Sequence, residues 1–172
     1  DYIDLLTTTF GWYSDETNKS QLNLIDSHDV PRALNTLDGD IPALKIALFL
    51  LFLQPEAPCI YYGTEVGLSG GIEPYCRECF PWNQSWEIDL RSFIRSLIDL
   101  RKTIRDTFSG VFSWEAVGQD ALLGCSSSTK GLGTNCQSII MIYINRSRKS
   151  WMPIESIFQE SLFLEGEIDQ QN

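Results

Sequence analysis

The first hundred residues alternate short apolar runs with polar clusters. Residues 21–26 hold a short apolar run, Leu22, Leu24 and Ile25, that ends abruptly in the polar cluster 26–29, which predicts a buried strand leading into a functional loop. Residues 58–63 form a second β-prone run, closed by a glycine, and predict a second buried strand. A glycine-rich, irregular segment is expected over residues 67–85.

Two helices are predicted between and after these strands. Residues 42–53 are apolar almost all round, and Asp40 before them and Pro42 at their start are typical of a helix N-terminus. From residue 87, apolar residues recur at i, i+3, i+4, i+7 and i+8, which is the spacing of an amphipathic helix. The residues of this stripe are Leu90, Phe93, Ile94, Leu97 and Ile98.

After residue 110 the periodicity becomes that of strands. Short β-prone runs are expected at 111–117, 121–126, 139–145, near 151–158 and at 162–164. This order of elements predicts the end of a parallel α/β domain over residues 1–109, followed by a small antiparallel β domain over residues 110–172. Because two strand-helix units cannot close a sheet, the first domain is expected to complete a larger structure.

Composition and charge narrow the classes of function. The 172 residues carry 13 basic and 23 acidic side chains, a formal charge of −10, and 43% are hydrophobic. That hydrophobic fraction suffices for a folded core. The acidic balance argues against binding nucleic acid or an anionic membrane, since both need clustered Lys and Arg. The longest apolar stretch, residues 46–53, is far shorter than the roughly 20 residues that cross a bilayer.

The cysteines and the N-terminus bear on location and processing. Five cysteines, an odd number scattered along the chain, favour reduced thiols and hence a cytoplasmic protein. Cys76 and Cys79 have half the spacing of a zinc ribbon, but no second cysteine pair or histidine lies at ligand distance in the sequence, so we expect no zinc site. We also expect no other metal site and no cofactor. The chain starts at Asp1 without an initiator Met or a signal-type segment, which leads us to expect that its beginning is missing or removed.

The polar cluster after the first strand is where chemistry is expected. His28, the only histidine, lies beside Asp29, with Asp26 and Arg32 on either side. In a barrel of alternating strands and helices, the loops after the strands converge on the active site. A hydrogen-bonded structural histidine is the alternative, and the residue types alone leave both open.

Three blocks of residues carry a resemblance to a known family. Residues 24–32 (LIDSHDVPR) resemble the fourth sequence signature of the alpha-amylase superfamily of glycoside hydrolases, in the form found in its neopullulanase and cyclomaltodextrinase branch. Residues 58–67 (PCIYYGTEVG) are similar to that family's eighth barrel strand and the loop leaving it. Residues 70–77 (GGIEPYCR) with 79–82 (CFPW) resemble the substrate-side loop of the same branch, and the blocks follow the family's order and spacing.

The resemblance implies the last part of a (β/α)8 TIM barrel, followed by a small antiparallel β-sandwich domain. It also implies a retaining α-glucan hydrolase acting on α-1,4 and also α-1,6 glucosidic bonds in maltooligosaccharides, cyclodextrins or pullulan. Such enzymes use a carboxylate nucleophile and a second carboxylic acid that protonates the leaving oxygen. Neopullulanase-like enzymes often pair through an N-terminal domain, which implies a homodimeric parent.

The resemblance assigns roles to five residues. Asp29 matches the family's third carboxylate, which grips hydroxyls of the sugar ring and favours its distorted form. His28 matches a residue that binds the same sugar, and Arg32 either touches substrate or holds the loop. Glu73 and Arg77 match positions that contact the outer sugars on the glycone side, with a solvated ion pair as the alternative.

The family's nucleophile Asp and acid Glu lie on its fourth and fifth barrel strands, which would precede Asp1. Nothing in this chain replaces them, so the resemblance implies the C-terminal fragment of an enzyme, inactive by itself. The missing strands should leave an apolar edge exposed. A non-catalytic carbohydrate-binding or scaffold protein of the same fold is one alternative, and a transglycosylase, in which a sugar attacks the intermediate in place of water, is another.

Other residues near these blocks have ordinary interpretations as well as functional ones. Glu65 follows the second strand, but the family's corresponding glutamate is not one of its three catalytic carboxylates, so we expect a structural role. Tyr62, Phe80 and Trp82 are candidates for stacking on sugar faces, although most such aromatics are core residues.

Overall fold

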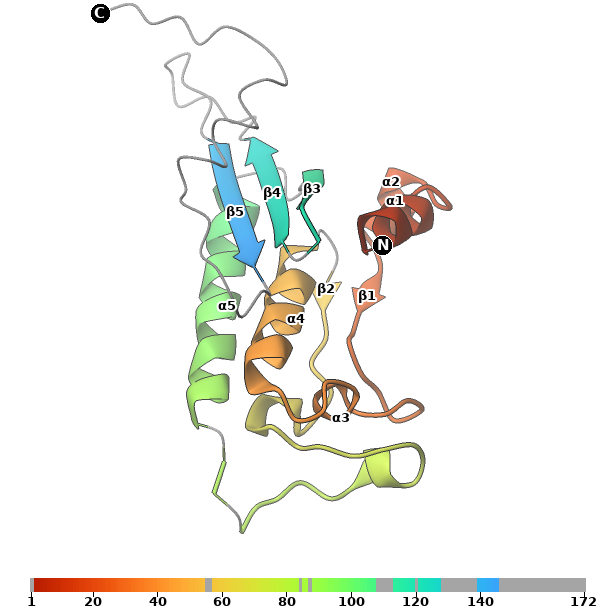
Figure 1. Cartoon of the computed structure of the whole chain (residues 1–172), viewed down its shortest axis with the longest axis vertical. Helices are drawn as coiled ribbons and strands as arrows, with labels where there is room; N and C mark the ends of the chain where they lie inside the picture. The colour runs from red at the N-terminus through yellow and green to blue at the C-terminus, as the bar shows by residue number, and fades with distance from the viewer. Residues whose placement is uncertain are drawn as a thin grey trace, which may run out of the picture.

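The computed structural model describes residues 2–54, 57–83, 85–86, 88–107, 113–119, 121–127 and 139–145 (Figure 1). The helices are α1 (Tyr2–Phe10), α2 (Asp15–Asn18), α3 (Ala33–Thr36), α4 (Ile41–Leu53) and α5 (Ile88–Thr107). The strands are β1 (Leu22–Asn23), β2 (Ala57–Pro58), β3 (Ser113–Val117), β4 (Ala121–Ser127) and β5 (Ile139–Asn145). Two single turns of 3-10 helix, η1 (Thr64–Val66) and η2 (Tyr75–Arg77), follow β2.

β1 and β2 pair in parallel, and α3 and α4 form the crossover between them. The ladder is short: the backbone N–H of Ala57 donates to Gln21 at 3.2 Å and that of Cys59 to Asn23 at 2.7 Å. Both predicted strands are present. The second lies earlier than residues 58–63, because the chain turns toward η1 soon after the ladder ends.

Helix α4 has the predicted start. The Asp40 carboxylate accepts a hydrogen bond from the backbone N–H of Ala43 at 3.0 Å, so it satisfies one of the free donors of the first turn. At the other end, Nη1 of Arg101 on α5 donates to the carbonyl of Phe52 at 2.7 Å and also to that of Gln54. A cation at a helix C-terminus is electrostatically favourable, and this one also ties α4 to α5.

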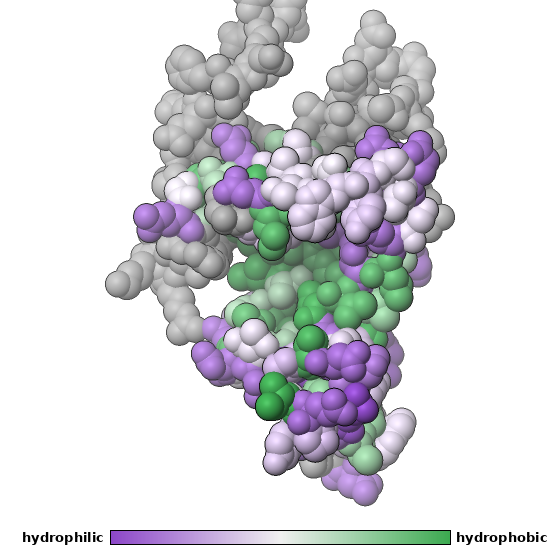
Figure 2. All heavy atoms as spheres, turned by 90° about the vertical axis from the view of Figure 1, so that its right-hand side faces the viewer, coloured by the Kyte–Doolittle hydropathy of each residue, from purple (hydrophilic) through white to green (hydrophobic). Residues whose placement is uncertain are grey.

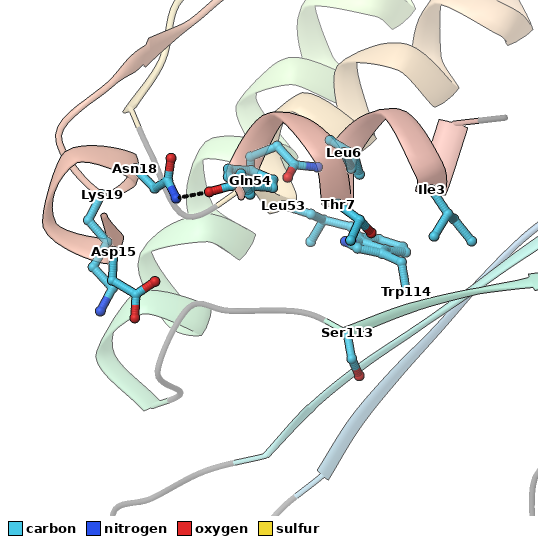
Figure 3. A pocket seen from close by; sticks show the side chains of 11 residues that line it. Ile3, Leu6, Thr7, Asp15, Asn18, Lys19, Leu53, Gln54, Ser113 and Trp114 are labelled. Carbon is cyan, nitrogen blue, oxygen red and sulfur yellow. Dashed lines mark hydrogen bonds between the residues drawn. The ribbon is translucent and has the colours of Figure 1, made fainter. Parts of the chain in front are cut away.

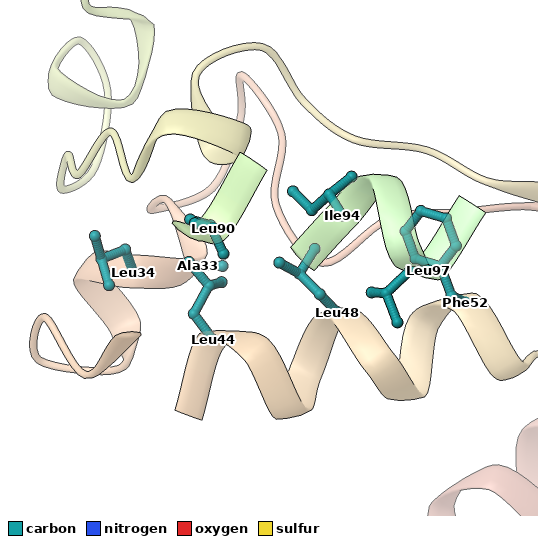
Figure 4. Close-up of a cluster of buried hydrophobic side chains, with 8 residues drawn as sticks. All are labelled: Ala33, Leu34, Leu44, Leu48, Phe52, Leu90, Ile94 and Leu97. Carbon is teal, nitrogen blue, oxygen red and sulfur yellow. The ribbon is translucent and has the colours of Figure 1, made fainter. Parts of the chain in front are cut away.

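The main core lies between α4 and α5, which stand side by side in Figure 1. Apolar side chains from the two helices and from α3 face one another in Figure 4, and they are Ala33, Leu34, Leu44, Leu48, Phe52, Leu90, Ile94 and Leu97. One residue of the predicted apolar stripe on α5 is not buried, since Ile98 is 41% exposed. The residues that α5 buries in this core are spaced i, i+4, i+7 from Leu90, which is the narrow stripe that faces a neighbouring helix.

The sequence pattern does not predict α1 and α2. They form a compact N-terminal hairpin in which the buried Asn18 side chain donates to the carbonyl of Phe10 at 2.9 Å. Ser14 caps α2 by accepting from the N–H of Thr17 at 3.4 Å. A serine cap of this kind is a recognisable start signal, but an α-helix of four residues has no periodicity that a sequence window can detect.

β3, β4 and β5 form one antiparallel sheet in that order, which confirms three of the predicted strands. Trp114 on β3 stands opposite Gly124 on β4, and a Cβ at Gly124 would collide with the indole ring. The absence of a side chain there lets the ring lie against the sheet. The predicted strands near 151–158 and at 162–164, and the predicted boundary near residue 109, lie outside the described residues, so the β-sandwich and the two-domain division stay predictions.

The face beside β1 and β2 is apolar and hollowed in Figure 2. Large hydrophobic side chains there are open to solvent: Leu22 is 61% exposed and Leu24 is 45% exposed. A contiguous apolar surface of this kind is typical of a face that packs against other protein. Among the helices that the structure describes, none is both long and apolar enough to pass through a membrane.

Candidate active site

Asp26 joins the ends of β1 and β2. It is 2% exposed, and its Oδ2 accepts hydrogen bonds from the N–H of Ala33 at 3.0 Å and the hydroxyl of Thr64 at 2.9 Å. Ala33 begins α3, whereas Thr64 begins η1 after β2. Hydrogen bonds to a charged acceptor are stronger than neutral ones. The loop that carries residues 27–32 therefore leaves from a fixed base.

The loop after β1 presents a carboxylate to solvent between two nitrogen-bearing side chains. His28 Nε2 lies 3.1 Å from Oδ2 of Asp29, and Arg77 Nη2 lies 3.4 Å from Oδ1 of the same residue. The side chains of His28 and Asp29 are 61% and 65% exposed. Ion pairs this exposed contribute about 0 to 1 kcal/mol, so stability alone does not account for the cluster.

Arg77 connects the two strand-end loops. Its Nη2 lies 3.0 Å from Oε1 of Glu73, and its Nε donates to the carbonyl of His28 at 3.0 Å. The ion pair with Glu73 that was the alternative to sugar binding is thus present. Both side chains keep much of their surface in solvent, 45% for Arg77 and 60% for Glu73, so the ion pair does not prevent contact with a ligand. Contact with outer sugars stays a prediction.

Arg32 lies beneath this surface and is fully buried, at 0% exposure. Its Nη1 donates to the carbonyl of Tyr62 at 2.6 Å, and its Cζ lies 4.5 Å from the ring centroid of Tyr61 and 4.7 Å from that of Tyr62. Its backbone N–H donates to Gly70 at 2.9 Å. Of the two roles left open by the sequence, these contacts favour holding the loop over touching substrate.

Tyr61 lies beside this cation, and its phenol has a raised pKa. Removal of the phenol from water raises the pKa of Tyr61, and the side chain of Tyr62 raises this pKa further. The neutral ring keeps the electron-rich face on which a guanidinium stacks.

The remaining candidates, Glu65, Phe80, Trp82 and Tyr62, have other surroundings. Glu65, on η1, is half-buried, and its Oε2 has no hydrogen-bond partner among the described residues. Trp82 is 75% exposed and packs against Phe80 with ring centroids 4.5 Å apart. Its exposed ring keeps the sugar-stacking prediction open. Tyr62 contacts Arg32 and its hydroxyl donates to the carbonyl of Glu78, but it is still 39% exposed, so its stacking also stays a prediction.

A pocket of about 450 Å³ lies elsewhere, between α1, the end of α4 and β3 (Figure 3). Trp114 points toward α1 there, close to Thr7 and Leu53. None of the five predicted site residues lines it. Its lining residues are Ile3, Leu6, Thr7, Phe10, Asp15, Asn18, Lys19, Leu53, Gln54, Ser113 and Trp114.

Two residues near the site have roles that the sequence does not reveal. The polar Asp26 at the end of an apolar run is a visible signal, since a buried carboxylate needs partners, although the sequence does not say which partners. Cys76 gives no signal beyond its spacing from Cys79, yet it is 0% exposed and its thiol donates to the carbonyl of His28 at 3.1 Å.

Residues 2–121 match the alpha amylase catalytic domain family. The chain belongs to the alpha-amylase family. Relatives named cyclomaltodextrinase, maltogenic amylase and neopullulanase match it, which places the chain in the neopullulanase and cyclomaltodextrinase branch.

Two relatives of this chain illustrate that members of the branch are much longer than it is. A cyclomaltodextrinase of Geobacillus thermopakistaniensis (strain MAS1) is 32% identical over 160 residues, covering 91% of this chain and 26% of the relative. An intracellular maltogenic amylase of Bacillus subtilis (strain 168) is 41% identical over 88 residues, covering 51% of this chain and 15% of the relative. The chain thus spans about a quarter or less of the length of these relatives.

The structure resembles that of the cyclic α-maltosyl-(1→6)-maltose hydrolase from Arthrobacter globiformis in complex with its named sugar. The TM-score is 0.66 at 31% identity, covering 75% of this chain and 29% of the other. The family and this likeness imply a (β/α)8 barrel, of which β1 and β2 are two strands. Asp29 and Arg77 follow the C-terminal ends of those strands, which is the active-site end of such a barrel.

Proposed function

We propose that the protein is a retaining glycoside hydrolase that cleaves α-1,4 glucosidic bonds, and also α-1,6 bonds, in maltooligosaccharides, cyclodextrins or pullulan. The observation that carries this proposal is the Asp29 carboxylate, which is 65% exposed in the loop after β1 and flanked by His28 and Arg77. Membership of the alpha-amylase family and relatives named cyclomaltodextrinase and neopullulanase support it.

Asp29 is proposed to stabilise the transition state. Cleavage passes through a species that resembles an oxocarbenium ion, so positive charge develops on the sugar ring. A carboxylate that accepts hydrogen bonds from ring hydroxyls binds more strongly as that charge grows. The exposure of Asp29 leaves its oxygens accessible to such hydroxyls.

The neighbouring side chains are proposed to bind sugar from the sides. His28 offers a ring nitrogen next to Asp29, and Glu73 with Arg77 offers a charged pair at the edge of the loop after β2. Planar charged groups suit paired hydroxyls because they can form two hydrogen bonds at once. Arg32 acts underneath, by holding the loop that carries His28 and Asp29.

Two further carboxyl groups are needed for the reaction, one as nucleophile and one as acid. We expect them to come from outside the 172 residues, so that the chain by itself is inactive. We further propose a cytoplasmic location, in keeping with the relative named intracellular maltogenic amylase. We propose that the full-length protein is a homodimer and that the molecule it binds is an α-glucan.

The stereochemistry of the product tests the proposal. We expect the full-length protein to hydrolyse maltotriose, β-cyclodextrin and pullulan and to release reducing ends that are initially in the α configuration, as proton NMR during the first turnovers will show. Initial β product would contradict a retaining mechanism. Binding without hydrolysis would favour the non-catalytic alternative, and products longer than the substrate would favour transglycosylation.

Glu73 provides a test of the outer sugar contacts. In the full-length protein, Glu73→Gln should raise KM for maltohexaose by roughly tenfold with little change in kcat, because the lost contact is present equally in the ground state and the transition state. Glu78→Gln is the matched control, since Glu78 is exposed in the same loop and its backbone carbonyl, which Tyr62 uses, is retained. A KM equal to that of the control would remove Glu73 from the sugar site.

A further inference from the structure

Two consecutive residues of η2 donate to the same backbone oxygen in the candidate active site. The thiol of Cys76 donates to the carbonyl of His28 at 3.1 Å, and Nε of Arg77 donates to it at 3.0 Å. Cys76 is 0% exposed, whereas the Arg77 side chain is 45% exposed. The His28 carbonyl therefore has one partner buried in protein and one at the surface.

The carbonyl in question belongs to the peptide that joins His28 to Asp29. A peptide unit is planar, so fixing the direction of its C=O also fixes the N–H of the next residue. The N–H of Asp29 in turn donates to the hydroxyl of Ser27 at 3.2 Å. The orientation of this one peptide unit sets where the Asp29 side chain starts.

The turn that carries Cys76 is itself fixed. Within it, the N–H of Tyr75 donates to Ile72 at 2.9 Å and that of Arg77 donates to Pro74 at 3.0 Å. Gly70 lies so close to the turn that a Cβ there would collide with the carbonyl of Tyr75. The thiol is thus presented to the His28 carbonyl from a tightly packed support.

We propose that Cys76 is a positioning residue for Asp29. This inference rests on the proposed function, because it matters for catalysis only if Asp29 acts on the sugar. Cys76 never touches substrate: its thiol orients the peptide between His28 and Asp29 from below, while Arg77 does so from the solvent side. A thiol suits the place because it packs as a small apolar group and still donates a weak hydrogen bond.

The test uses the full-length protein and p-nitrophenyl α-maltoside. Cys76→Ala removes the donor and is expected to lower kcat about three- to tenfold with KM unchanged, since one hydrogen bond that orients the carboxylate is lost. Cys76→Ser keeps a donor and should recover most of kcat. Cys79→Ala is the matched control, because Cys79 is exposed in the same loop, and should match the parent.

A double variant separates positioning from general packing. Cys76→Ala introduced into an Asp29→Asn background should lower kcat no further, because residues that act through one group are not additive. Equal losses for Cys76→Ala and Cys76→Ser, or a further loss in the Asp29→Asn background, would overturn the inference while leaving the proposed function intact. Parental turnover of Asp29→Asn alone would instead overturn the proposed role of Asp29, and with it this inference.

Discussion

Replacing Asp29 with asparagine is expected to lower kcat of the full-length protein on maltotriose by about a thousandfold, which corresponds to roughly 4 kcal/mol of lost transition-state stabilisation. Asparagine keeps the size of the side chain and one acceptor oxygen but removes the negative charge. The charge is what strengthens the hydrogen bonds to the sugar hydroxyls as the ring becomes positive. KM should change much less than kcat, because the lost interaction is strongest in the transition state.

The same substitution should leave the fold intact. The Asp29 side chain is 65% exposed and its ion pairs are at the surface, so we expect a change in unfolding free energy of about 0.5 kcal/mol or less. Asp99→Asn is the matched control, since Asp99 is a surface carboxylate 78% exposed on α5, far along the chain from the site. Turnover by Asp29→Asn close to that of this control would refute the proposed role.

Asp26→Ala is expected to cause the largest loss of stability among the site residues, about 2 to 4 kcal/mol. The substitution removes two hydrogen bonds to a buried carboxylate and leaves the N–H of Ala33 and the hydroxyl of Thr64 without that partner. Both are buried, at 6% and 3% exposure, so water cannot readily replace the lost acceptor. The loss would appear as a lower Tm and a lower urea midpoint of the full-length protein.

Two variants show whether hydrogen bonding is the cause. Asp26→Asn retains an oxygen that can accept from the same donors and should lose clearly less stability than Asp26→Ala. Asp99→Ala removes an exposed carboxylate and should cost about 0.5 kcal/mol or less. If Asp26→Ala melted at the temperature of Asp99→Ala, the buried carboxylate would not be what joins the two strand ends.

Elements with a long, regular pattern could be predicted from the sequence. The helix over 42–53 and the helix from 87 onward are present as α4 and α5 because their apolar residues repeat over several turns. Three of the predicted strands form the sheet β3-β4-β5. They could be predicted because each has a strand-like pattern of apolar residues and turn residues at its ends. In contrast, the sequence did not predict α1 and α2. The β1–β2 ladder is also shorter than the two strands predicted over residues 21–26 and 58–63.

The candidate site could be predicted in part. His28, Asp29, Glu73 and Arg77 come together although the described chain between residues 29 and 73 includes α3, α4, β2 and η1. The motif resemblance identified them, whereas periodicity by itself does not bring two loops into contact. For Arg32 the sequence left two roles open, and only its burial against the rings of Tyr61 and Tyr62 favours one of them.

By itself, the sequence determined the two long helices α4 and α5 and the three strands of the antiparallel sheet, which loop carries the histidine and the acid, and which family the chain resembles. These depend on local spacing and on residue identity, both of which are written along the chain. The tertiary structure alone decided that Asp26 joins two strand ends, that Arg32 is buried, and that Cys76 and Arg77 share one carbonyl. Some of these are contacts between residues that are distant in sequence, and the others depend on burial. Both arise only when the chain packs, so local sequence patterns do not reveal them.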